Sequence, residues 1–124
     1  MLFMNDYDLI QETISDYFEG YMTKDRKRLE KAFCLGIATM VAYWKNEDGI
    51  QELVSSSIED DIDDWVSPEH ATYGNGEGKI ISMHIFSKDG ASVTFDCGGR
   101  FIDTFSLVKI DGAWKIANKF FVDQ

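Results

Sequence analysis

The end of the chain, residues 100–121, most constrains the fold because its sequence, RFIDTFSLVKIDGAWKIANKFF, contains a complete β-hairpin. Asp111-Gly112 is a dipeptide that tolerates the positive φ angles of a tight two-residue turn. If pairing continues from this turn without interruption, Asp103 lies opposite Phe120. The sequence therefore predicts two long antiparallel strands in one fixed register.

This register divides the hairpin into two faces, because side chains alternate across a strand. One face is mainly aromatic and apolar, and it carries Phe101, Asp103, Phe105, Leu107, Lys109, Trp114, Ile116, Asn118 and Phe120. The opposite face is small, mixed and cationic, and it carries Ile102, Thr104, Ser106, Val108, Lys115, Ala117, Lys119 and Phe121. Such a division is typical of an antiparallel sheet with one face packed against a core.

Two polar residues, Asp103 and Asn118, interrupt the aromatic face. A carboxylate in such a place reaches water or a hydrogen-bond partner, or its pKa is raised by desolvation. One interpretation is structural: Asp103 bonds a nearby backbone or tyrosine group and holds a loop or helix end. The other is functional: Asp103 and Asn118 are the polar points of an otherwise apolar small-molecule pocket.

Length and composition predict one domain spanning residues 1–124, since a chain this long, 44% hydrophobic and 14% aromatic, can bury a sizeable core. The net charge of -10 argues against nucleic acid or an anionic membrane as a partner. Residues 1–10 lack the pattern of a signal peptide and no stretch is apolar enough to span a membrane, so we expect a cytoplasmic protein. Cys34 and Cys97 are expected to be reduced thiols.

Helical patterns come first along the chain and strand patterns last, which indicates an α+β fold. Apolar spacing predicts a helix from Asp6 to about Met22, a second capped by Thr23 or Asp25, and a third capped by Ser57 and ending before Pro68. Strands are expected over residues 37–44, 50–54, 79–87 and 91–96, followed by the terminal hairpin. The result is about three helices packed in an antiparallel sheet of four to six strands.

Four segments in this order carry a family resemblance: YFEG at residues 17–20, LEKAF at 29–33, KIISM at 79–83, and FIDTFSLVKIDGAWKIANKFF at 101–121. The chain resembles the putative lumazine-binding family, within the nuclear-transport-factor-2-like (SnoaL-like) superfamily. This resemblance implies a cone-shaped fold with a strongly curved sheet and a pocket at one end. It also implies a homodimer, for which the sheet face of Ile102, Thr104, Ser106, Val108 and Ala117 is a candidate surface.

The chain matches only part of the catalytic pattern of the isomerase-like relatives. They carry a base aspartate on the first strand and a tyrosine on the first helix that stabilises an enolate, and Tyr17 matches that tyrosine. The position of the base is occupied by the apolar run 40–43. Relatives also place a histidine and an acidic residue after the phenylalanine of the second helix, whereas Phe33 is followed by Cys-Leu-Gly.

The histidines and acidic residues give weaker predictions. His84 is interpreted either as a structural sheet residue or as an acid or base in the pocket, since its near-neutral pKa permits both protonation states. His70 and Glu69 form too small a group to predict a metal site, and the acidic residues 59–64 form a solvated helix face. We therefore expect no metal and no cofactor.

Three hypotheses follow. The first is a domain that binds a small apolar or aromatic ligand without chemistry, in a pocket between the first helix and the sheet, lined by Tyr17, Tyr21, Trp65, Phe101, Asp103, Phe105, Trp114 and Asn118. The second is an isomerase, cyclase or dehydratase with Asp103 or His84 as general base and Tyr17 as donor to an oxyanion. The third is a non-catalytic module for dimerisation or protein interaction.

Overall fold

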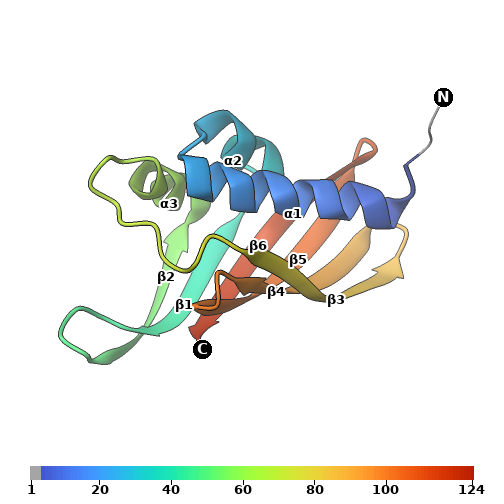
Figure 1. The fold of residues 1–124 in the computed structure, drawn as a ribbon. Coiled ribbons are helices and arrows are strands. Elements are labelled where there is room, and N and C mark those ends of the chain that lie inside the picture. Colours follow the sequence, from blue (N-terminus) through green and yellow to red (C-terminus); the bar gives the residue numbers. More distant parts are fainter. Residues whose placement is uncertain (1–3) are drawn as a thin grey trace.

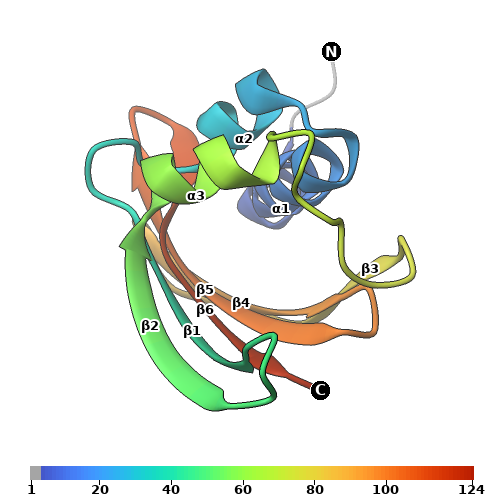
Figure 2. The same ribbon diagram turned by 90° about the vertical axis from the view of Figure 1, so that its left-hand side faces the viewer.

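A computed structural model describes residues 4–124 as three helices on one face of a six-stranded sheet. In chain order the elements are α1 (Asp6–Thr23), α2 (Arg26–Ala32), β1 (Thr39–Lys45), β2 (Gln51–Ser57), α3 (Ile58–Trp65), β3 (Gly78–Ser87), β4 (Gly90–Cys97), β5 (Phe101–Ile110) and β6 (Ala113–Asp123). The sheet curves around the helices, and α1 lies across its concave side (Figures 1 and 2). The predicted fold class is confirmed.

The strand order is β2-β1-β6-β5-β4-β3, so the last strand of the chain lies in the middle of the sheet. Neighbouring strands pair antiparallel with one exception: β1 and β6 run parallel, with Thr39 opposite Asn118. The sequence analysis predicted antiparallel pairing throughout. It could not locate this parallel contact because β1 and β6 are far apart in the chain and each carries an ordinary strand pattern.

Short polar side chains begin each helix, as the capping preferences predict. Asn5 accepts a hydrogen bond from the Asp8 amide at 2.9 Å, and Asp25 and Ser57 cap α2 and α3 in the same way. The tight turn at Asp111-Gly112 is also confirmed, since both residues have positive φ angles, 51° and 81°. Local sequence therefore sets these helix starts and this hairpin.

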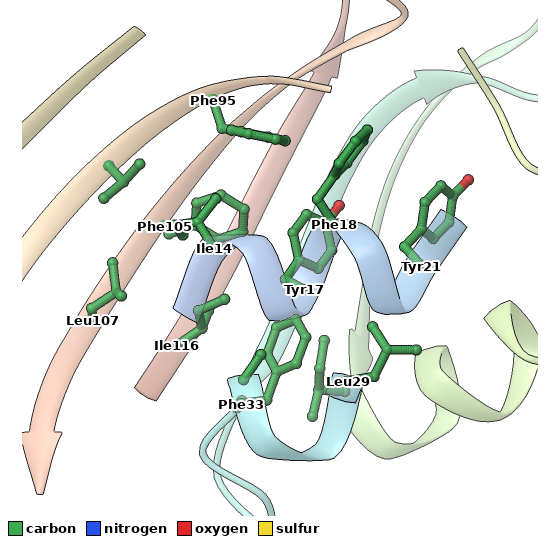
Figure 3. Close-up of a cluster of buried hydrophobic side chains, with 14 of the residues drawn as sticks. Ile14, Tyr17, Phe18, Tyr21, Leu29, Phe33, Phe95, Phe105, Leu107 and Ile116 are labelled. Atoms are coloured by element: carbon green, nitrogen blue, oxygen red, sulfur yellow. The ribbon is translucent and has the colours of Figure 1, made fainter. Parts of the chain in front are cut away.

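The core lies between α1 and the concave face of the sheet (Figure 3). Tyr17 projects from α1 into it, with its ring centroid 5.3 Å from that of Phe105 and 5.9 Å from that of Phe33. All three side chains are at least 98% buried. Within residues 4–124, no helix is both long enough and apolar enough to cross a membrane.

Candidate functional site

A β-bulge at Ala117 interrupts the terminal hairpin and changes which side chains face the core. Ile116 pairs with Leu107 and Asn118 pairs with Ser106, so Ala117 has no partner on β5. Beyond this point Phe105 lies opposite Lys119, and Asp103 lies opposite Phe121. The uninterrupted register predicted from the sequence is wrong here, because the extra residue shifts the alternation of β6 by one.

The bulge exchanges Asn118 for Lys119 on the inner face. Lys119 is only 3% exposed, although the sequence analysis placed it on the outer face. Asn118 lies on the outer face and donates to Thr39 Oγ1 at 3.0 Å, so its predicted place in the pocket is wrong. Phe121 likewise replaces Phe120 on the inside, with its ring 4.7 Å from that of Phe101.

Lys119 forms a buried cluster with Asp103 and Tyr17. Its Nζ lies 3.2 Å from Asp103 Oδ1, the distance of an ion pair. The Tyr17 hydroxyl donates to Asp103 Oδ2 at 3.1 Å. Asp103 has no exposed surface, so its carboxylate is neutralised by Lys119 rather than by water. The tyrosine bond predicted by the structural interpretation of Asp103 is present.

Burial changes the proton affinity of the groups around this cluster. It raises the pKa of Asp103, and the nearby Lys119 charge opposes that rise. Burial, with Asp103 adding to the effect, also raises the pKa of Tyr17 well above its ordinary value and that of the Cys97 thiol to about 12. Tyr17 is therefore a hydrogen-bond donor, and Cys97 is a protonated thiol.

A cavity of about 310 Å³ lies beside this cluster. Its walls are mainly aromatic, contributed by Tyr17 and Tyr21 of α1, Trp44 of β1, Trp65 of α3, Tyr73, Phe101 of β5 and Phe121 of β6. Its polar lining comes mainly from Ser55, Ser56, Asp61, Asp64, His70 and Lys119. A cavity with many apolar surfaces and a few polar groups is the usual form of a small-molecule site.

The acidic side of the cavity is built by α3 and the loop that follows it. Asp61 accepts from Ser56 Oγ with both carboxylate oxygens at 2.8 Å, and burial raises the pKa of Asp61. Asp64 Oδ2 lies 3.0 Å from His70 Nδ1. The Nε2 atom of His70 is buried without a hydrogen-bond partner in the described chain. Two carboxylates and one imidazole thus belong to the lining of a mainly aromatic cavity.

Lys24 fixes the loop that carries this side of the cavity. It ends α1 in the left-handed conformation, with φ 57°, and its Nζ donates to the carbonyls of Trp65, Ser67 and His70 at 3.1, 2.8 and 2.9 Å. The Trp65 carbonyl is in the last turn of α3, where backbone acceptors have no partner within the helix, and the other two belong to the loop that follows. One ammonium group therefore links α1 to the segment that presents Trp65 and His70.

We expect Lys24→Asn to lower the free energy of unfolding by about 1.5–3 kcal/mol, because asparagine tolerates the left-handed conformation but cannot reach the carbonyls. Amide hydrogen exchange should also become faster in residues 65–70. Lys27→Gln is the matched control, since it removes an exposed cation one turn away. Equal losses of stability in the two variants would show that the three carbonyl bonds contribute nothing measurable.

The structure brings together only part of the predicted ligand set. Tyr17, Tyr21, Trp65 and Phe101 line the cavity, whereas Asp103 lies behind Lys119. Phe105 is in the core, and Trp114 lies near the other end of α1, where its Nε1 donates to Asp6 at 3.0 Å. These two aromatic residues share the inner face but lie farther along the strands than the cavity does.

His84, the second candidate base, is exposed on β3 and pairs with the exposed Ser92, so it does not line the cavity. Sequence reasoning missed Lys119, His70 and Asp61 as lining residues. None of the three left a local sequence signal, because uninterrupted alternation along residues 113–121 places Lys119 on the outer face. The proposed dimer surface, Ile102, Thr104, Ser106, Val108 and Ala117, lies opposite the core face and stays a prediction.

Among residues 4–124, no three His, Cys, Asp or Glu side chains are grouped so that they could hold a metal ion. The chemistry that the described residues offer is therefore that of a lysine, a tyrosine hydroxyl, carboxylates and an imidazole around aromatic surfaces. These groups can orient a ligand through hydrogen bonds and one charge while the rings bury its apolar part.

Comparisons with known proteins identify a family from the sequence and a fold from solved structures. The sequence model of a family described as "Putative lumazine-binding" matches residues 5–122. No curated protein matches the sequence. Among solved structures, a nuclear-transport-factor-2-like protein of unknown function from Shewanella baltica OS155 is 25% identical, with a TM-score of 0.72 over 98% of this chain and 95% of that chain.

Two further structures show the same fold at lower identity. A nuclear-transport-factor-2-like protein of unknown function from Methylobacillus flagellatus KT is 23% identical, with a TM-score of 0.74 over 99% of this chain and 95% of that one. A ketosteroid isomerase-like protein from Erwinia carotovora atroseptica SCRI1043 is 13% identical, with a TM-score of 0.67 over 98% of both chains.

Proposed function

The chain belongs to the putative lumazine-binding family of the nuclear-transport-factor-2-like superfamily, and on that premise we propose that its cavity binds a flat heteroaromatic small molecule. The observation that carries the proposal is the set of seven aromatic rings around one cavity of about 310 Å³. This volume lies at the small end of ligand pockets, which favours a compound of two or three fused rings.

The polar groups of the cavity suit the edge of such a ring system. Lumazine, a pteridine dione, has an apolar ring face and carries carbonyl acceptors and ring N–H donors on its edge. Lys119 can donate to a carbonyl, and the Asp61 carboxylate can accept from a ring N–H. The two lining residues come from different elements, Lys119 from β6 and Asp61 from α3. A planar ligand with both kinds of group can therefore be held by its faces and by its edge.

The test is a titration of the purified protein with lumazine and with riboflavin, read by the fluorescence of Trp44 and Trp65 and by thermal unfolding. A ligand specific to the folded state stabilises it by about 2.7 kcal/mol at a free concentration of 100 times Kd. We expect Ser55→Trp to abolish binding, since Ser55 lines the cavity on β2 and a large ring there fills it.

Ser92→Trp is the matched control, because Ser92 is an exposed strand residue on the sheet face away from the cavity. It should leave the affinity unchanged. Equal binding by both variants would place the ligand elsewhere, and the absence of binding to either compound at millimolar concentration would refute the proposed ligand class.

A further inference from the structure

Lys119 has surroundings that are unusual for a lysine. Its side chain is 4% exposed, and the carboxylate of Asp103 is the one oxygen partner that the described residues give its Nζ. The remaining neighbours of Nζ are the Met40 sulfur at 3.6 Å and the rings of Phe121, Tyr17 and Trp65, with centroids 4.1, 5.6 and 5.8 Å away. An ammonium group has three N–H donors, and here two of them meet only rings and a thioether.

The partner of Lys119 is suited to take a proton from it. Asp103 is fully buried, and burial raises the pKa of its carboxyl group. The Asp103 carboxylate, 3.2 Å from Lys119 Nζ, is placed to accept a proton from it when a carbonyl carbon approaches. A neutral amine in a desolvated pocket is a nucleophile toward carbonyl carbon.

The β-bulge brings Lys119 into the lining of the ligand cavity. Ala117 shifts the alternation of β6, so Lys119 lies among the lining residues and not on the outer face. Bulges of this kind commonly re-aim a side chain at a functional site.

We propose that Lys119 forms an imine with an aldehyde or ketone bound in the cavity. This inference rests on the proposed function, because it assigns a reactive carbonyl to a ligand of the same site. Asp103 accepts a proton from Nζ, the Nζ lone pair attacks the carbonyl carbon, and the C=O π electrons move to oxygen. This oxygen takes the proton from Asp103 and a second proton from Nζ. Loss of water breaks the C–O bond and forms C=N. The protonated imine keeps the positive charge of Lys119, and Asp103 remains its counter-ion.

The test is reductive trapping with 2-naphthaldehyde and sodium cyanoborohydride at pH 7, followed by peptide mass spectrometry. Exposed lysines of the same chain, Lys79 and Lys88, are internal controls that experience the same reagent. We expect labelling at Lys119 to be about tenfold or more faster than at either control, since hydride adds only to the imine. Labelling at Lys119 no faster than at Lys79 and Lys88 would overturn the proposal.

The non-carbonyl analogue 2-naphthamide separates this proposal from the proposed function. It should quench the fluorescence of the cavity tryptophans and compete with labelling of Lys119. Binding of 2-naphthamide without selective labelling would refute the imine alone, whereas the absence of binding would refute the ligand cavity as well.

Discussion

Lys119→Met is expected to lower the free energy of unfolding by about 3–5 kcal/mol at pH 7, because it leaves the carboxylate of Asp103 buried without its counter-ion. Urea denaturation followed by far-ultraviolet circular dichroism measures the loss. The double variant Asp103→Asn/Lys119→Met should recover most of it, since Tyr17 can still donate to the asparagine oxygen. A single variant as stable as the wild type would show that the ion pair contributes nothing net.

The free energy of unfolding that Lys119→Met loses should become smaller as the pH falls. The pKa of Asp103 is already above its ordinary value of 3.8 through burial, and removal of the Lys119 charge raises it further. Between 3.8 and this raised pKa, the folded state binds a proton that the unfolded state releases. Stability of the variant therefore increases as the pH falls through this window. Its deficit relative to wild type should be largest above the window and smaller near its lower end.

Trp65→Ala is expected to have the second large effect, a loss of about 3–5 kcal/mol, because it removes a large buried ring from the core. Trp65 is 6% exposed, and its ring lies 5.9 Å from that of Tyr17 and 5.7 Å from that of Tyr21. Thermal and urea unfolding measure this loss. Trp65 thus forms part of the cavity wall and of the packing that supports α3.

Trp44→Ala is the matched variant, since Trp44 lines the same cavity but is only half-buried and its ring neighbour is Tyr73, at 6.5 Å. We expect it to cost about 1 kcal/mol of stability, within the common range for single substitutions, while it weakens lumazine binding. If the two variants lose equal free energy of unfolding, Trp65 contributes no more to stability than Trp44 does, and its deeper burial has no structural effect.

The sequence predicted the elements well because local signals set them. Capping residues, the Asp111-Gly112 turn and the spacing of apolar residues each act over a few positions, and the structure confirms the helix starts and the hairpin. The aromatic pocket residues on α1 were also predicted, because Tyr17 and Tyr21 share the helix face that carries Ile10 and Ile14.

The polar part of the site could not be predicted, because it depends on a non-local irregularity. Ala117 gives no local sign of a bulge, and without it strict alternation places Asn118 inside and Lys119 outside. A shift of one residue moves every later side chain of a strand to the other face. His70 could not be predicted for a different reason. Its carbonyl oxygen accepts a hydrogen bond from Lys24 Nζ, and Lys24 lies 46 residues earlier in the chain.

The parallel pairing of β1 with β6 has a consequence for how the protein is made. Thr39 and Asn118 meet across 79 residues, and β6 is synthesised after both β1 and β5, the strands between which it lies. Until β6 has left the ribosome, β1 and β5 each present an unpaired edge, and such edges are prone to aggregate. A chain truncated before residue 113 thus has two separate sheet fragments, and neither can enclose a ligand.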